Sequence, residues 1–160
     1  MSTLTLAELV KDRRADELIS LPASANVADA VAVMCEREVG AVLVMTEDGL
    51  VAGLFSERDL LTRVVHAGRD PQTTPLSLVM TRDVKFVTPA TSTEAALALM
   101  HLHRFRHLLV IDGPRVHGLV SMRDLVVQII RSGEGRYEQV VRGARPVGPV
   151  GPDADVRIGE

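Results

Sequence analysis

The chain has 160 residues, of which 46% are hydrophobic, and its 18 basic and 21 acidic side chains give a net charge of −3. This hydrophobic content favours a folded core. The excess of acidic side chains argues against a nucleic-acid or anionic membrane surface as partner. No apolar stretch approaches the roughly 20 residues that a membrane span needs. The single cysteine, Cys35, cannot form an internal disulfide, and the N-terminal stretch lacks the charge order of a secretory signal, so we expect a cytoplasmic protein.

The predicted elements begin with an N-terminal helix and lead-in over 1–17, followed by a first unit over 18–66. This unit combines apolar residues at helical spacing with short aliphatic runs that are typical of buried strands. An Asp-Gly pair between two runs predicts a turn and therefore a hairpin. In chain order we expect an extended segment around Pro22, a helix at 27–38 capped by Asn26, strands at 41–45 and 50–55 joined at Asp48-Gly49, and a helix from Ser56.

A linker with a short helix near 76–80 spans 67–83, and a second unit over 84–133 repeats the first. The stretch Gly-Leu-x-Ser-x-Arg-Asp-Leu occurs in both units, which is unlikely by chance. In chain order we expect an extended segment around Thr88, a helix at 93–103 capped by Ser92, strands at 107–111 and 115–120 joined at Asp112-Gly113, and a helix from Ser121. The Gly- and Pro-rich end, 134–160, predicts a helix turn and a flexible tail.

The repeat predicts a mixed α/β (α+β) fold of two β-α-β-β-α units related by a pseudo-two-fold axis. One unit alone is too small to bury both faces of its sheet. The two small sheets, flanked by helices, are therefore expected to pack on each other.

Each predicted strand-to-helix junction carries a Ser-x-Arg-Asp motif. A helix N-terminus binds anions through its unpaired N–H groups, and serine and arginine add donors for a phosphate. The aspartate offers two acceptor oxygens, which suit the paired hydroxyls of a ribose. The same serine and aspartate also form a capping box that serves the helix alone, and the two interpretations are compatible. The candidate residues are Ser56, Arg58, Asp59, Ser121, Arg123 and Asp124.

With these motifs, roughly residues 5–133 resemble tandem cystathionine-β-synthase (CBS) domains, which together are called a Bateman module. The chain is similar to the small stand-alone members of this family. The resemblance implies that the serine and aspartate of each motif contact nucleotide phosphate and ribose. It also implies roles for Thr88 in the extended segment and for Arg106-His107, which enter the hairpin and meet phosphate. The first copy has Gly40-Ala41 and an acidic Glu57 there, so we expect one good site, dominated by the second copy.

The resemblance further implies an adenosine ligand, AMP first, with ATP, NAD(H) and S-adenosylmethionine also compatible. It implies no catalytic cofactor and no enzymatic activity, a homodimer that pairs through flanking helices, and a separate target protein. The sequence leaves open a ligand-free scaffold for dimerisation or interaction, which Gly40-Ala41 and Glu57 favour. An enzyme is the third and least favoured alternative. No nucleophile–base pair or P-loop that would support it is recognisable in the sequence.

Two further features have simpler explanations than chemistry. His101 and His103 are spaced as His-x-His, but on a helix they point in different directions, so we expect solvated histidines and no metal site. Cys35 lies on the first predicted helix with no recognisable partner, and we expect it at a core or boundary position.

Overall fold

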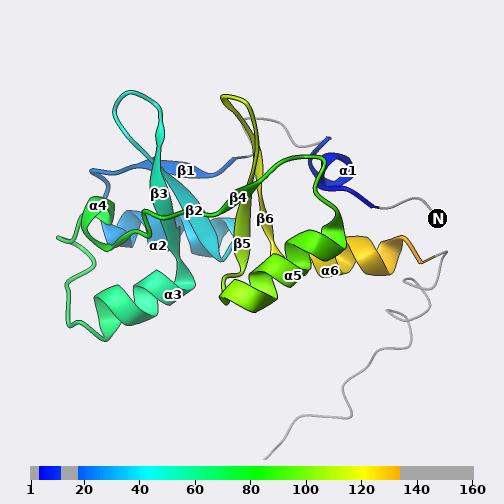
Figure 1. The fold of residues 1–160 in the computed structure, drawn as a ribbon. Coiled ribbons are helices and arrows are strands. Elements are labelled where there is room, and N and C mark those ends of the chain that lie inside the picture. The colour runs from blue at the N-terminus through cyan, green and yellow to red at the C-terminus, as the bar shows by residue number, and fades with distance from the viewer. Residues whose placement is uncertain (1–3, 12–17, 134–160) are drawn as a thin grey trace, which may run out of the picture.

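The computed structural model describes residues 4–11 and 18–133, and the predictions for the lead-in at 12–17 and for 134–160 lie outside them. Two units with the same order of elements follow each other along the chain (Figure 1). The first contains β1 (Ser20–Pro22), α2 (Val27–Arg37), β2 (Ala41–Met45), β3 (Val51–Ser56), α3 (Glu57–Asp59) and a π-helical segment, η2 (Leu60–Val65). The second contains β4 (Phe86–Val87), α5 (Thr93–His103), β5 (His107–Asp112), β6 (Arg115–Ser121) and α6 (Met122–Arg131). The predicted mixed fold is confirmed.

Each unit has one three-stranded sheet with the same topology. The orders are β1-β2-β3 and β4-β5-β6, in which the first strand is parallel to the middle strand and the hairpin is antiparallel. The predicted turns contain Gly49 and Gly113, with φ of 77° and 55°, a conformation that glycine adopts without strain. Both hairpins also shift register at equivalent points, after Val44 and after Val110. The two units are therefore copies in detail as well as in element order.

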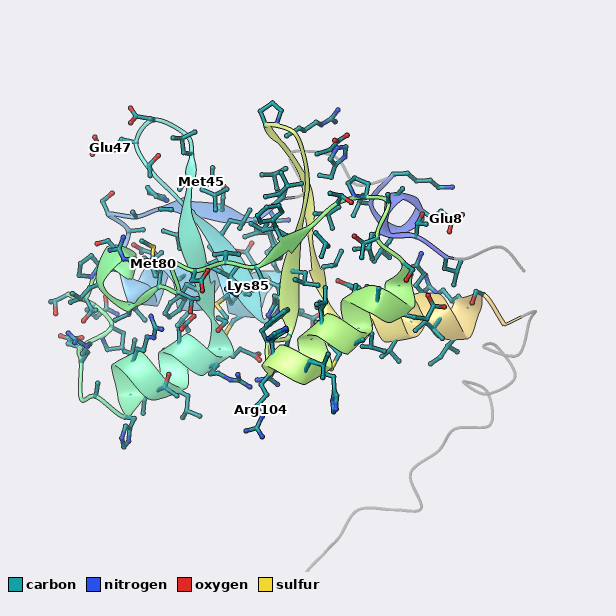
Figure 2. The ribbon with its side chains drawn as sticks, in the orientation of Figure 1. Glu8, Met45, Glu47, Met80, Lys85 and Arg104 are labelled. Carbon is teal, nitrogen blue, oxygen red and sulfur yellow. The ribbon has the colours of Figure 1, made fainter. Side chains whose placement is uncertain are left out.

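Apolar side chains on both faces of the sheets join the units into one structure. One face of each sheet packs against the helices of its own unit. The other faces meet each other, where Leu43 and Leu54 of the first unit cluster with Leu109 and Leu119 of the second. Charged side chains such as Glu47 and Arg104 point away from this body, whereas Met80 lies within it (Figure 2). The sheets bury each other as the short strands require.

Two short helices are exchanged between the units. Helix α1 (Leu6–Val10) precedes the first unit but packs on the second, where the Leu6 N–H donates to the Thr91 carbonyl at 2.9 Å. Helix α4 (Leu76–Val79) precedes the second unit but packs on the first, where the Leu76 N–H donates to the Ala25 carbonyl at 2.8 Å. Figure 1 shows α1 and α4 at opposite ends of the molecule. Leu6 and Leu76 are both fully buried, so each unit depends on a segment from outside its repeat.

The chain after α4 runs along the edge of β3. Leu54 and Thr81 exchange two backbone hydrogen bonds, of 2.9 and 2.8 Å. A Cβ at Gly53 would lie 2.5 Å from the Thr81 carbonyl oxygen, so the motif glycine of the first unit is required for this close approach. Among the described residues, no helix is long and apolar enough to cross a membrane.

Candidate functional site

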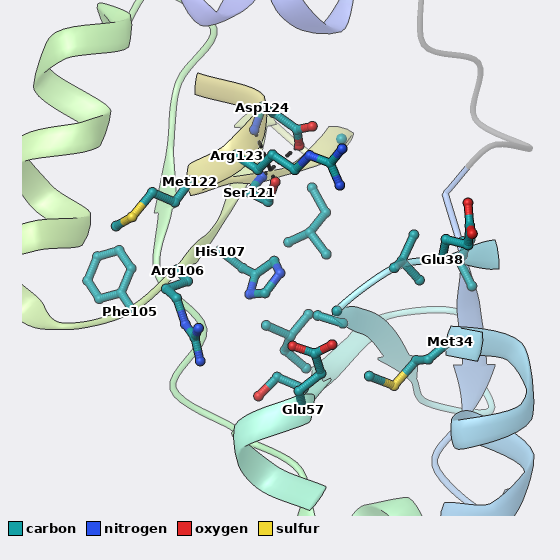
Figure 3. A pocket seen from close by; sticks show the side chains of 18 of the residues that line it. Met34, Glu38, Glu57, Phe105, Arg106, His107, Ser121, Met122, Arg123 and Asp124 are labelled. Carbon is teal, nitrogen blue, oxygen red and sulfur yellow. Dashed lines mark hydrogen bonds between the residues drawn. The ribbon is translucent and has the colours of Figure 1, made fainter. Parts of the chain in front are cut away.

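A cleft of about 1570 Å³ lies between the two units, and both Ser-x-Arg-Asp junctions line it. Figure 3 shows the second junction, with Glu57 of the first unit across the cleft from it. All the predicted site residues except Thr88 lie along its walls. Thr88 is exposed after β4 and is not part of this lining. The lining residues that the sequence predicted are Ser56, Arg58, Asp59, Arg106, His107, Ser121, Arg123 and Asp124.

Both junctions form capping boxes. In the first, the Ser56 N–H donates to Asp59 Oδ2 at 3.0 Å, and the Asp59 N–H donates to Ser56 Oγ at 3.3 Å. In the second, the matching distances between Ser121 and Asp124 are 2.8 and 3.2 Å. The capping interpretation is confirmed at both places. It leaves a ligand role open, because a cap uses only part of each side chain's hydrogen-bonding capacity.

The carboxylate of the first junction's aspartate is buried and bonded to other side chains and backbone groups of the protein. Asp59 is only 5% exposed. Its Oδ1 accepts a hydrogen bond from Thr81 Oγ1 at 2.9 Å and lies 3.4 Å from Arg63 Nε, while Oδ2 also accepts from Ser56 Oγ at 3.0 Å. These partners occupy most acceptor positions of the carboxylate. A ribose at this junction would have to displace them.

The aspartate of the second junction has different surroundings. Gln128 stands four residues after Asp124, at the place that Arg63 holds in the first unit. The Gln128 amide is engaged elsewhere, since it accepts from Thr93 Oγ1 at 2.8 Å and donates to the Thr5 carbonyl at 3.2 Å. Asp124 is half-buried and lines the cleft. Part of Asp124 is exposed to the cleft, where a ligand can reach it.

The backbone ties each helix start to the start of its middle strand. The Met122 N–H donates to the Arg106 carbonyl at 2.9 Å, and the Glu57 N–H donates to the Gly40 carbonyl at 3.0 Å. In the second unit this bond holds the basic pair that enters β5 beside the Ser121 junction. In the first unit the same bond holds a glycine, so no basic side chain enters the cleft from that position.

The two motif arginines differ as the two aspartates do: the arginine of the first junction is bonded within the protein, and the arginine of the second is exposed. Arg58 is held across the gap between the units, because its Nη1 donates to the Arg104 carbonyl at 2.7 Å. Arg123 is exposed and lies with Ser121 and Asp124 on one wall of the cleft (Figure 3), and its guanidinium has no hydrogen bond within the described part of the chain. The second junction thus has an arginine available to a ligand.

His107 lies in the middle of this group. Burial lowers the pKa of His107 below its ordinary value, and the nearby Arg106 guanidinium lowers the pKa further, against the smaller raising effects of Asp124 and Glu57. The imidazole is therefore neutral near pH 7. A bound phosphate would supply the negative charge that favours the protonated ring.

Other predictions about reactive side chains have mixed outcomes. Cys35 is exposed and lines the cleft, so the expected core or boundary position was wrong: this face of α2 borders the gap between the units. His101 and His103 are exposed on α5, and His103 stacks on Phe105 with ring centroids 5.9 Å apart. In residues 4–11 and 18–133 no three His, Cys, Asp or Glu side chains are grouped as metal ligands would be.

Several lining residues had no signal in the sequence. Glu8 and Leu9 of α1 reach the cleft only because α1 packs on the second unit. Glu38 lies there because α2 ends at it in a left-handed conformation, with φ of 53°. His117 of β6 also lines the cleft, and only its alternation along the strand could have suggested this.

Comparison with known proteins points to one family. A sequence model of the CBS domain matches residues 10–66 and 76–131. The CBS domain-containing protein YhcV of Bacillus subtilis is 33% identical over 118 residues, which cover 74% of this chain and 83% of YhcV. The solved structure of a putative signal-transduction protein with CBS domains from Burkholderia ambifaria superposes with a TM-score of 0.75 at 36% identity, covering 81% of this chain and 96% of that one.

Longer proteins contain the same region. CBSCBSPB3, a CBS domain-containing protein of Arabidopsis thaliana, is 33% identical over 130 residues, which are 81% of this chain. The matched region is only 23% of the plant protein, so this chain spans about a quarter of that relative. The similarity to this plant protein therefore concerns the paired units.

Proposed function

The chain belongs to the CBS domain family as a tandem pair of domains, and from this premise we propose that it is a regulatory module whose cleft binds an adenine nucleotide, AMP first. Tandem CBS modules are regulatory and often bind adenine nucleotides. YhcV is named as a CBS domain-containing protein and not by a reaction, and the Burkholderia protein is described as a putative signal-transduction protein with CBS domains. We propose a sensor without catalytic activity that acts on a separate target protein.

The observation that carries this proposal is the set of groups around the second junction. Asp124 has surface in the cleft for ribose hydroxyls, and the N-terminal end of α6, which carries a partial positive charge, lies at the same wall. Arg106, His107 and Arg123 stand around the same space and supply donors for a phosphate (Figure 3). We propose a single strong site here, because the first junction uses both Asp59 and Arg58 in its own structure.

We expect AMP to bind and to raise the melting temperature of the chain. A ligand that binds only the folded state stabilises it by mass action, by about 2.7 kcal/mol at 100 times Kd. Thermal unfolding with AMP, ADP, ATP, NAD(H) and S-adenosylmethionine, followed by calorimetric titration of the compounds that shift it, measures this effect. If none of these compounds shifts the transition, the proposed function is wrong.

The same titration should depend on pH through His107. The free imidazole has a lowered pKa, and a bound phosphate raises it, so the complex takes up a proton. We therefore expect the affinity for AMP to rise as pH falls from 7.5 to 6.5, above the phosphate pKa of about 6. Adenosine, which has no phosphate, and the His107→Asn variant should both lack this dependence.

A second candidate role, dimerisation, is favoured by exposed apolar pairs. Leu61 and Val65 on η2 are 63% and 62% exposed, and Val126 and Ile130 occupy the equivalent positions on α6, 39% and 38% exposed. These pairs repeat with the pseudo-two-fold relation of the units. We propose that a second copy of the chain covers them, because a two-fold interface requires a self-complementary apolar surface.

We expect the unaltered chain to sediment as a dimer at micromolar concentration. The double variant Leu61→Glu/Ile130→Glu should sediment as a monomer, because each carboxylate would be buried without a partner. Leu50→Glu is the matched control, since Leu50 is 66% exposed on the β2–β3 loop and outside these helices. A monomeric unaltered chain would contradict the dimer, and nucleotide binding by that monomer would leave the sensor proposal intact.

A further inference from the structure

The side chain of Glu57 lines the cleft and takes no part in the capping box of Ser56 and Asp59. Glu57 is the first residue of α3, and its backbone N–H is bonded to the Gly40 carbonyl. Its side chain folds back over the same glycine, because a Cβ built at Gly40 would lie 3.3 Å from Glu57 Oε2. The carboxylate therefore occupies the space that a side chain at the start of β2 would use.

The second unit has the opposite charge at the equivalent place. Arg106 stands at the position of Gly40, and the uncharged Met122 stands at the position of Glu57. Figure 3 shows the Glu57 carboxylate on the side of the cleft opposite Ser121, with the imidazole of His107 between them. A phosphate held at the second junction by the basic groups thus has a carboxylate on its far side.

We propose that Glu57 determines the phosphate selectivity of the cleft, so that a nucleoside monophosphate is accepted and di- and triphosphates are disfavoured. This inference rests on the proposed function and specifies its ligand. The Arg106 and Arg123 guanidinium groups balance the two negative charges of one phosphate. The Arg58 guanidinium, which also lines the cleft, is bonded to the Arg104 carbonyl.

Each added phosphate brings further negative charge into the cleft. Repulsion between the Glu57 carboxylate and the phosphates grows with that charge, and it is stronger in a partly desolvated cleft than in water. Removing the charge of Glu57 should therefore favour ATP more than AMP. The effect should not require a change of fold, because the bond between Glu57 and Gly40 uses only backbone atoms.

The test is calorimetric titration of adenosine, AMP, ADP and ATP into the unaltered chain, Glu57→Gln and Glu57→Met. Glutamine keeps the shape of the side chain, and methionine reproduces the residue of the second unit. Glu47→Gln is the matched control, since Glu47 is an exposed carboxylate on the β2–β3 loop and outside the cleft lining. Thermal unfolding of each variant without ligand reports the fold.

We expect the unaltered chain to bind AMP at least about tenfold more tightly than ATP, and both Glu57 variants to reduce that ratio to about threefold or less. Glu47→Gln should keep the original ratio, and adenosine should bind equally to all four proteins. An unchanged AMP-to-ATP ratio in Glu57→Gln would overturn this inference and leave nucleotide binding established. Failure of every protein to bind any of the four ligands would overturn the proposed function as well.

Discussion

Asp124→Ala should lower the affinity for AMP by at least about 100-fold, while the chain remains folded. Two hydrogen bonds from ribose hydroxyls to a charged carboxylate are together worth about 3 kcal/mol, which corresponds to this factor. The substitution also removes one half of the capping box, whose loss costs about 1 kcal/mol. Ser121 still accepts from the N–H of residue 124, so α6 keeps its start. Calorimetric titration gives the affinity, and thermal unfolding gives the stability.

Asp124→Asn is the control that separates these effects. The amide oxygen can still accept from the Ser121 N–H, but it offers a ribose a neutral acceptor instead of a charged one. We expect this variant to unfold at nearly the original temperature and to bind AMP at an affinity between those of the unaltered chain and Asp124→Ala. If AMP binds Asp124→Ala with undiminished affinity, the ribose does not lie at this residue.

Asp59→Ala should have the reverse pattern, with a loss of about 2 to 3 kcal/mol in the free energy of unfolding and little change in AMP affinity. The variant leaves Thr81 Oγ1 and Arg63 Nε without their buried acceptor and removes the cap on the Ser56 N–H. The segment after α4 then loses its side-chain bond to α3 and keeps only its backbone bonds to β3. Denaturant unfolding measures the stability, and titration below the transition should give an affinity within about threefold of the original.

The pair of variants tests the inequality of the two junctions directly. Thr81→Val removes one partner of Asp59 without touching the cap, and it should destabilise the chain by about 1 kcal/mol with no effect on AMP. If Asp59→Ala and Asp124→Ala lower the affinity for AMP equally, both junctions contact the ligand. The interpretation of Asp59 as a purely internal acceptor would then be wrong.

Much of the fold follows from short stretches of sequence. The caps at Asn26 and Ser92 and the turns at Gly49 and Gly113 were predicted at the residues where the structure has them. Each depends on residues within three or four positions of one another, so the local pattern contains the necessary information. The capping boxes, and with them the Ser-x-Arg-Asp residues that line the cleft, were predictable for the same reason.

The inequality of the two junctions is visible in the sequence only in part. Gly40 and Glu57 against Arg106 and Met122 already indicate that the first copy lacks a basic pair and carries an extra carboxylate. The sequence does not indicate that Asp59 is hydrogen-bonded within the protein, because its partner Thr81 is 22 residues away in the linker. Arg58 likewise bonds to the carbonyl of Arg104, 46 residues away.

The sequence by itself determined the repeat, the order of the elements and the placing of a Ser-x-Arg-Asp motif at each helix start. Only the tertiary structure decided that α1 and α4 are exchanged between the units, that Cys35 faces the cleft, and which aspartate keeps surface for a ligand. The physical reason is the separation along the chain between the residues that interact. Periodicity, caps and turns are set by neighbours in the chain, whereas burial and hydrogen-bond partners depend on segments that only packing brings together.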